Sequence, residues 1–210
     1  MQLIGMLDSP FVRRVAVSMA VLDIAFEHRP LSVFRHFDAF AAVNPVVKAP
    51  TLIEDDGTLL IDSSLILDHL DHKVPPQRRL MPQDTEQRRR ALHLIGFALA
   101  ACEKTVQIVY ERNLRPADKQ HEPWIDRVSG QLSAAYAMLE RELAASGGVA
   151  RGDGWLTGER MMQADLTVAI AWRFTQYILP GTIDPALHPA LAAFSERAEA
   201  LPVFAGAPLA

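Results

Sequence analysis

The stretch NPVVKAPTLIEDDGTLLIDSSLILDHLD, residues 44–71, contains the clearest structural signals in the chain. The turn sequence Asp55-Asp56-Gly57 separates two short apolar runs, a pattern typical of a β-hairpin. Pro50 has no backbone N–H, so it belongs at the start of a strand or in a cis turn. The stretch and the residue after it predict a strand over 50–54, a strand over 58–61 and a helix over 63–72.

The residues before this stretch alternate between short strand patterns and helical patterns. From Phe11 to Phe26, apolar residues recur at spacings of three and four, which places them on one face of a helix. The expected elements are strands over 2–7 and 27–33 and helices over 11–26 and 36–42. The element order predicted for residues 1–75 is therefore β-α-β-α-β-β-α.

Residues 76–83 are expected to link two domains. Pro75, Pro76 and Pro82 remove backbone donors in this region and stop helices. Beyond them the apolar spacing is almost wholly helical, with helices expected over 85–113, 117–145, 164–178 and 187–201. We therefore predict an α/β domain over 1–75 followed by an all-helical domain over 84–210.

The composition excludes several classes of function. The 210 residues carry 21 Lys and Arg against 25 Asp and Glu, a formal net charge of −4, which argues against a nucleic-acid partner. The single cysteine, Cys102, excludes an internal disulfide, a CxxC redox motif and a zinc–thiolate site. No basic residue precedes the apolar run at the N-terminus, and the longest apolar stretch, 91–102, is shorter than the ~20 residues of a membrane span. We expect a cytoplasmic protein with no membrane partner.

Ser9-Pro10 opens the first predicted helix and allows two interpretations. Serine is a preferred N-cap and proline suits the first helical turn, so Ser9 could serve only as a cap. The roles are not exclusive, because a capping oxygen accepts a hydrogen bond while its own O–H stays free to donate. The helix dipole favours negative charge at this end, so Ser9 could also hold an anion such as a thiolate.

Two further junctions also allow a structural and a functional interpretation. Residues 44–52 could form an ordinary loop, or a cis turn at Pro50 that exposes the Ala49 backbone N–H and C=O to a peptide-like ligand. Asp62 or Ser63 could simply cap the helix that follows. Alternatively, the free N–H groups of that helix and the Ser63 hydroxyl bind a carboxylate, while Asp62 pairs with an ammonium group.

Taken together, the segments SPFVRRVAVSMAVLDIAFE (9–27), NPVVKAPTL (44–52) and DGTLLIDSSLILDHLD (56–71) resemble the glutathione S-transferase family. The segment WLTGERMMQAD (155–165) resembles the start of the core helix of that family, so the likeness covers essentially the whole chain. The likeness is to bacterial and plant-type members that use a serine in place of a tyrosine. It implies a thioredoxin-like fold for the first domain.

The resemblance also implies roles for residues around the sulfur of glutathione. Ser9 matches the serine that donates a hydrogen bond to this sulfur. Ala49, the residue before a cis Pro50, matches the position whose backbone pairs with the cysteinyl part of glutathione.

The two ends of glutathione are assigned to other residues by the same resemblance. Lys48 and Arg35 match positions that approach the glycine carboxylate. Asp62 and Ser63 match the acidic-Ser pair that holds the γ-glutamyl end, with Asp in place of the more usual Glu. One departure concerns the core helix, where Met162 stands in place of the Ser or Thr of a capping box.

The activity implied is that of a glutathione S-transferase, a detoxification enzyme that activates the glutathione thiol for attack on a hydrophobic alkyl or aryl electrophile. Glutathione is the co-substrate, no metal is implied, and the protein is expected to be a homodimer. A thiol of pKa near 8.5 needs about 2 kcal/mol to be half ionised at pH 7. A hydrogen bond from Ser9 to a charged sulfur supplies roughly 1.5–3 kcal/mol, so no general base is required.

Other functions remain open for the same site. Glutathione-dependent isomerisation or peroxide reduction uses the same thiolate. A non-catalytic relative that binds glutathione or another ligand, or that acts in protein interactions, is a different class. The presence of Ser9, Lys48, Asp62 and Ser63 favours real glutathione binding. A thiol-transfer enzyme with its own cysteine is disfavoured, because no Cys occupies the start of the first helix.

Overall fold

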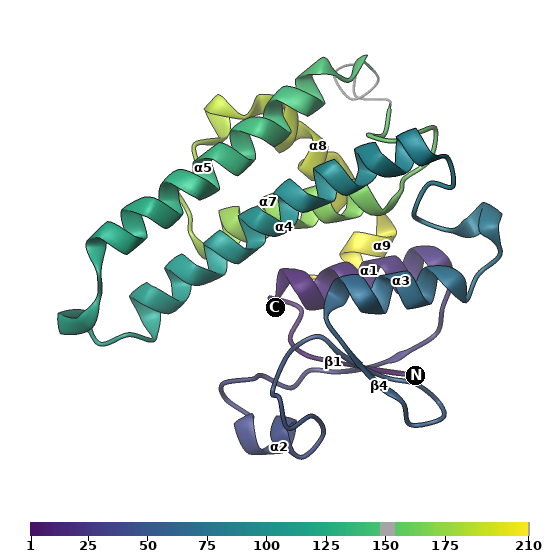
Figure 1. Ribbon diagram of the computed structural model, residues 1–210, viewed down its shortest axis with the longest axis horizontal. Helices are drawn as coiled ribbons and strands as arrows, with labels where there is room; N and C mark the ends of the chain where they lie inside the picture. The colour runs from purple at the N-terminus through teal and green to yellow at the C-terminus, as the bar shows by residue number, and fades with distance from the viewer. Residues whose placement is uncertain (148–153, 210) are drawn as a thin grey trace. The chain divides into compact units, whose positions relative to one another are not determined.

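The computed structural model describes residues 1–147 and 154–209. Contacts between residues divide the chain into two compact units. The first contains Met1–Met81 together with the residues from Ala200 onward, and the second contains Pro82–Glu199 (Figure 1). Each unit is described by itself below.

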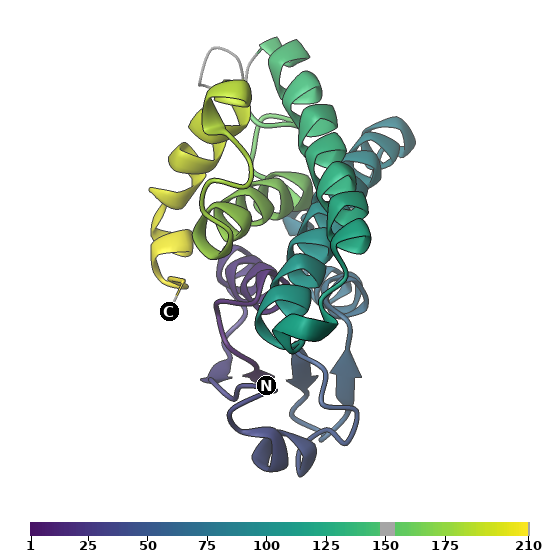
Figure 2. The ribbon, with the colours of Figure 1, turned by 90° about the vertical axis from the view of Figure 1, so that its left-hand side faces the viewer.

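The first unit has the predicted order β-α-β-α-β-β-α. Its elements are β1 (Gln2–Ile4), α1 (Pro10–Leu22), β2 (Glu27–Arg29), α2 (Phe37–Ala41), β3 (Thr51–Ile53), β4 (Leu59–Ile61) and α3 (Ser63–His72). The sheet order is β2-β1-β3-β4, with β1 and β2 parallel and the other pairs antiparallel. Helices α1 and α3 cover one face of the sheet and α2 lies on the other (Figures 1 and 2). The predicted thioredoxin-like fold is confirmed.

The predicted first helix is too long at its C-terminal end. The apolar spacing continues to Phe26, but α1 ends at Leu22. Asp23 adopts a left-handed conformation, with φ 55° and ψ 44°, and its N–H donates to the Ala20 carbonyl. A left-handed residue terminates the helical hydrogen-bond pattern, and Asp tolerates this conformation better than most residues. Apolar spacing alone does not report such a stop.

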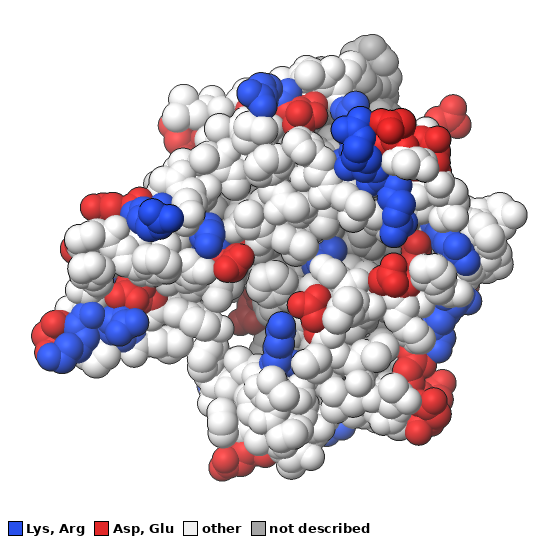
Figure 3. All heavy atoms as spheres, in the orientation of Figure 1, with Lys and Arg blue, Asp and Glu red and all other residues white. Residues whose placement is uncertain are grey.

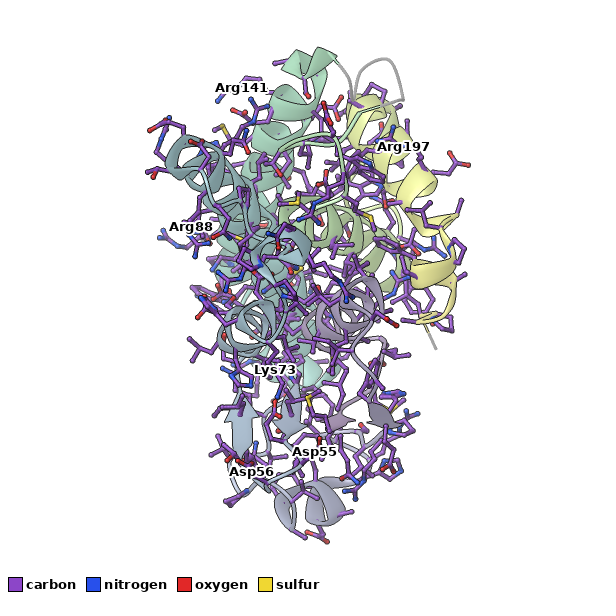
Figure 4. The ribbon with its side chains drawn as sticks, turned by 90° about the vertical axis from the view of Figure 1, so that its right-hand side faces the viewer. Asp55, Asp56, Lys73, Arg88, Arg141 and Arg197 are labelled. Carbon is purple, nitrogen blue, oxygen red and sulfur yellow. The ribbon has the colours of Figure 1, made fainter. Side chains whose placement is uncertain are left out.

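The hairpin turn lies where the sequence predicts it, at the end of the sheet marked by Asp55 and Asp56 (Figure 4). Asp56 accepts a hydrogen bond from the Thr58 N–H at 2.8 Å. Gly57 has φ 87°, a conformation that glycine adopts without steric cost. The Asp-Gly pair therefore closes the turn in the manner that its composition indicates.

The last described residues of the chain pack on α1. Arg13 is buried, and its Nε donates to the Ala207 carbonyl at 2.7 Å. Its guanidinium also lies over the Phe204 ring, 5.7 Å from the centroid, in the short helix α9 (Pro202–Ala205). These contacts group the C-terminal residues with the first unit, whereas the sequence analysis places all of 84–210 in one helical domain. The partners are 194 residues apart, so local patterns could not reveal them.

The proline-rich connection is held in place by α3. It contains a turn of 3₁₀ helix, η1 (Pro76–Arg78). The carboxylate of Asp71, which is buried, accepts hydrogen bonds from the N–H groups of Leu80 at 2.5 Å and Met81 at 3.3 Å. The prolines stop the helix as predicted, and Asp71 satisfies the backbone donors that follow.

The second unit is helical. Its described elements are α4 (Thr85–Asn113), η2 (Ala117–Lys119), α5 (Glu122–Ala145), α7 (Gln163–Ile178), η3 (Pro185–Leu187) and α8 (Pro189–Glu199). Helix α4 packs against α5 and α7, and α7 packs against α8. The helix predicted over 117–145 is interrupted before α5, because Pro123 occupies the first turn of a new helix. The helix predicted over 187–201 likewise begins at Pro189.

Asp165 organises the start of α7. It is fully buried, and its two carboxylate oxygens accept the N–H groups of Leu156 at 2.7 Å and Met162 at 2.8 Å. Although Met162 replaces the Ser or Thr of the capping box, the half of the box that Asp165 provides is intact. Met162 supplies a thioether, a weak acceptor, where the family has a hydroxyl. Burial raises the pKa of Asp165 to about 6, against the opposing effect of the two backbone hydrogen bonds.

Helix α4 is long and apolar enough to cross a membrane by length and composition, with a mean hydropathy of 1.4 over its most apolar window. Core helices of soluble proteins pass the same test, and α4 buries residues against α5 and α7. On the face drawn in Figure 3, the blue Lys and Arg side chains are interspersed with the red Asp and Glu side chains. This mixture agrees with the balanced composition of the chain.

Candidate active site

The register of the sheet brings three segments to one edge. Ile4 of β1 is paired with Thr51 of β3, and Thr51 is paired with Ile61 of β4. Gly5, Pro50 and Asp62 are the next residues beyond these pairs. Because neighbouring strands are about 4.8 Å apart, these residues leave the sheet side by side. The segment that leads to Ser9, the 44–52 motif and the 61–64 motif therefore meet the sheet at the same edge.

Ser9 caps helix α1. Its backbone is extended, with φ −75° and ψ 123°, and its Oγ lies 3.5 Å from the Val12 N–H. The predicted N-cap is confirmed, although this bond is long. The side chain is half-buried, and accepting from the helix leaves its hydroxyl hydrogen available for another acceptor. The position at the helix N-terminus favours an anionic acceptor.

Asn44 shapes the loop before β3. It is buried, and its Nδ2 donates to the Thr51 Oγ1 at 2.8 Å while its Oδ1 accepts from the Val46 N–H at 3.0 Å. The Thr51 Oγ1 in turn donates to the Lys48 carbonyl at 2.8 Å. The Ala49–Pro50 peptide bond is cis, as the cis-turn interpretation predicts. Asn44 belongs to the NPVVKAPTL motif, but local sequence alone does not indicate this role.

Gly5 allows the start of α1 and the Ala49 loop to approach each other. It has φ 140°, and a Cβ built there would lie 2.5 Å from a Val12 methyl carbon and 3.1 Å from the Ala49 Cβ. Real Cβ atoms do not approach other atoms as closely as 2.5 Å. Only glycine fits this position, and the approach places Ala49 beside the turn that carries Ser9.

We expect Gly5→Ala to destabilise the protein by about 2–4 kcal/mol, because strain at positive φ adds to overpacking. Thermal or urea unfolding measures this change. Gly57→Ala is the matched control, since Gly57 also has positive φ but has no atoms within 4 Å of the built Cβ. If both variants lose the same stability, the close approach at Gly5 has no energetic consequence.

Lys48 and Asp62 form an ion pair, with 3.4 Å between Nζ and Oδ2. Both side chains are about half exposed, so a ligand with charged ends could exchange for either partner. The Asp62 Oδ1 also accepts from the Ser64 N–H at 2.9 Å, which makes Asp62 the cap of α3. Burial opposes ionisation of Asp62, but the Ser64 N–H and the Lys48 charge outweigh it and hold its pKa below the usual value.

Asp62 is also a backbone outlier. Its φ is 73° and its ψ is 120°, a region that residues other than glycine rarely occupy. Such conformations cluster at ligand sites, where the surrounding structure holds them in place. The outlier and the ion pair together mark the junction of β4 and α3 as a candidate binding element.

Ser63 lies at the first position of α3 and is buried. The guanidinium of Arg14, also buried, donates from one nitrogen to the Ser63 Oγ and to the Ser64 Oγ, each at 3.1 Å. Arg14 was not among the predicted site residues, because it occupies a helix whose apolar spacing predicts an ordinary packed face. The feature that could have indicated a role for Arg14 is the presence of a basic residue in a mostly apolar helix.

Arg35 lies in the turn that leads into α2 and is exposed. Its positive charge acts on Asp8, the neighbour of Ser9. Burial raises the pKa of Asp8, and this effect exceeds the opposing effects of Arg35 and of the Ser9 N–H. Arg35 therefore lies near the turn between β1 and α1, in the same unit as the other candidate residues.

The second unit has a cavity of its own, of about 480 Å³, where α4 ends and α5 begins. Tyr110, Leu114 and Trp124 contribute exposed apolar and aromatic surface to it. Its wall also contains Glu111, which accepts hydrogen bonds from Arg115 Nε and the His121 N–H, both at 2.9 Å. Within residues 1–147 and 154–209, no group of three or more His, Cys, Asp or Glu side chains could hold a metal ion.

The family comparisons agree with this geometry. Residues 3–78 match the model of the glutathione S-transferase N-terminal domain, and residues 122–197 match that of the C-terminal domain. The chain belongs to the glutathione S-transferase family. The predicted family and fold class are thereby confirmed.

Individual relatives are distant from this family member. The chain is 25% identical over 184 residues to the uncharacterised glutathione S-transferase-like protein YibF of Escherichia coli K12, covering 86% of each. It is 26% identical over 161 residues to the maleylacetoacetate isomerase of Pseudomonas aeruginosa, covering 73% of this chain and 71% of that one.

Solved structures of the family resemble the chain over nearly its whole length. A glutathione S-transferase from Methylobacterium radiotolerans, in complex with glutathione sulfonate, has a TM-score of 0.88 at 27% identity. The match covers all of this chain and 95% of that one. A family member from Pseudomonas fluorescens Pf-5 with bound glutathione has a TM-score of 0.83 at 29% identity, covering 98% and 97%. Both similar proteins hold glutathione or a close derivative.

Proposed function

We propose that the protein is a glutathione transferase in which the Ser9 hydroxyl donates a hydrogen bond to the glutathione sulfur. The observation that carries this proposal is the convergence of the Ser9 cap, the Ala49–Pro50 cis turn and Asp62 at one edge of the sheet. A tripeptide needs contacts at its middle and at both ends, and these three segments provide them. The similar structures that hold glutathione support the same ligand.

Each part of glutathione has a chemically suited partner in this proposal. The backbone of Ala49 pairs with the cysteinyl unit, and the cationic side chains of Lys48 and Arg35 take the glycine carboxylate. Asp62 takes the γ-glutamyl ammonium, and Ser63 at the α3 N-terminus takes the neighbouring carboxylate. Ligand binding then exchanges the Lys48–Asp62 pair for two ion pairs with the tripeptide.

The reaction begins with loss of the thiol proton to solvent. The Ser9 O–H then stabilises the thiolate, which attacks an electrophilic carbon. A carbon–sulfur bond forms, and the bond from carbon to the leaving group breaks, with the electron pair departing on the leaving group.

Glutathione-dependent isomerisation is the second candidate, because one relative is named maleylacetoacetate isomerase and another probable maleylacetoacetate isomerase 2. In that reaction the thiolate adds to a cis double bond conjugated to a carbonyl, rotation follows, and elimination restores the thiolate. The same Ser9 contact serves both reactions. They differ in stoichiometry, since conjugation consumes one glutathione per turnover and isomerisation consumes none.

Calorimetric titration with glutathione tests the proposal, followed by assays with alkyl halides, aryl halides and a cis-enone. Binding together with consumption of glutathione supports the transferase, and turnover without consumption supports the isomerase. Binding without turnover indicates a non-catalytic relative. No heat at millimolar glutathione would remove glutathione from the function altogether. Light scattering tests the predicted homodimer in the same sample.

A further inference from the structure

Arg14 is a buried cation beside the candidate site for the γ-glutamyl end. It projects from α1, is 3% exposed, and contacts hydroxyls of two consecutive residues of α3. Ser63 is 4% exposed, whereas Ser64 is an exposed residue. Arg14 therefore contacts the first turn of α3 through one buried serine and one exposed serine.

The chemistry of these groups fixes the direction of the hydrogen bonds. A guanidinium has donors only, so both serine oxygens must accept from it. Neither hydroxyl hydrogen can then point at Arg14, and each is left to donate elsewhere. A positive charge on the accepting side also strengthens the donation, because linked hydrogen bonds polarise one another.

We propose that Arg14 is a positioning residue that turns Ser63 and Ser64 into donors for the α-carboxylate of a γ-glutamyl ligand. The adjacent Asp62 carboxylate suits the α-ammonium of the same group. Asp62, Ser63 and Ser64 thus select a free amino-acid end that carries both charges. Arg14 orients the two serines from its position on α1. This inference rests on the proposed glutathione function and adds to it the residues that recognise the α-carboxylate of the ligand.

A purely structural role is the competing explanation, because Arg14 also connects α1 with α3. The two explanations differ for a ligand that lacks the α-carboxylate. A structural brace affects every ligand alike, whereas a positioning residue acts only where the carboxylate is present. γ-Aminobutyryl-cysteinyl-glycine is such a ligand, since it differs from glutathione only by the loss of that carboxylate.

The experiment measures the Kd of both tripeptides by calorimetry for the wild-type protein and for Arg14→Met. We expect Arg14→Met to raise the Kd of glutathione about tenfold or more, which corresponds to the loss of one charge-assisted contact. The Kd of the analogue should change less than twofold. Arg14→Lys retains the charge and should recover part of the loss. Saturating turnover should change little in either variant, so the effect appears in KM and not in kcat.

Arg13→Met is the matched control, since Arg13 is equally buried in α1 but contacts the C-terminal residues. It should leave the ratio of the two Kd values unchanged. If Arg14→Met fails to fold, Ser64→Ala removes the exposed hydroxyl and should abolish part of the same preference. The role of Arg14 is overturned if Arg14→Met weakens the binding of both tripeptides equally, or weakens the binding of neither. Absence of wild-type glutathione binding instead overturns the proposed function.

Discussion

Ser9→Ala should lower turnover at neutral pH about 10- to 100-fold while the Kd for glutathione changes only slightly. A hydrogen bond to a charged acceptor contributes roughly 1.5–3 kcal/mol, and its loss raises the pKa of the bound thiol by about 1–2 units. The thiolate fraction at pH 7 falls in the same proportion. The neutral thiol still binds, because Ala49, Lys48 and Asp62 are assigned to other parts of the tripeptide.

The measurement is the pH dependence of the rate, together with titration of the bound thiol by the ultraviolet absorbance of the thiolate. Both midpoints should move upward in Ser9→Ala, and the two variants should converge at high pH. Ser9→Thr retains the hydroxyl and should keep more of the rate.

The variant also removes a helix cap, which requires a separate control. Asp84→Ala removes the N-cap of α4, where the Asp84 Oδ1 accepts from the Gln87 N–H at 2.9 Å. It should cost about 1 kcal/mol of stability and leave the pH profile unchanged. An unaltered rate and pH profile in Ser9→Ala would remove Ser9 from the mechanism, whatever its effect on stability.

Features with a local signal were predictable from the sequence. Helix α3 covers Ser63–His72 and α4 covers Thr85–Asn113, the ranges that apolar spacing indicates. The hairpin followed from its Asp-Gly turn, and the cis bond at Pro50 was one of two stated interpretations. In each case neighbours in sequence determine the conformation, through turn geometry or the period of a helix.

Features that depend on distant partners were not predictable. The left-handed Asp23 ends α1 while the apolar spacing continues. Arg13 and Arg14 look alike in the sequence, yet one binds residues near the C-terminus and the other binds α3. Their partners lie 194 and 49 residues away, so only the folded chain shows which partner each arginine has.

The second large effect is expected from Asp165→Ala, which should lower the free energy of unfolding by about 2–4 kcal/mol at pH 7. The variant leaves two buried backbone N–H groups, those of Leu156 and Met162, without their acceptor. Each such group costs about 1–3 kcal/mol, partly offset because the ionised carboxylate no longer has to be buried. Asp184→Ala is the control, because Asp184 caps η3 from an exposed position and should cost far less.

The pH dependence of stability tests the same residue in a different way. Burial raises the pKa of folded Asp165 from 3.8 to about 6. Below about pH 3 the group is protonated in both states. As pH rises from about 3 to 7 the unfolded chain ionises first, so stability falls, and the loss is nearly complete by about pH 7. A shift of about 2 units corresponds to about 3 kcal/mol.

Other carboxyl groups titrate in the same range, so the expected result is a difference between two proteins. Asp165→Asn does not titrate and serves as the reference at each pH. The stability of the wild type relative to Asp165→Asn, from urea unfolding, should decrease by about 3 kcal/mol between pH 3 and 7. A difference that rises over this range would mean that the two N–H bonds outweigh burial and that the pKa of Asp165 is lowered. The start of α7 would then be stabilised by a buried charge and not merely tolerate one.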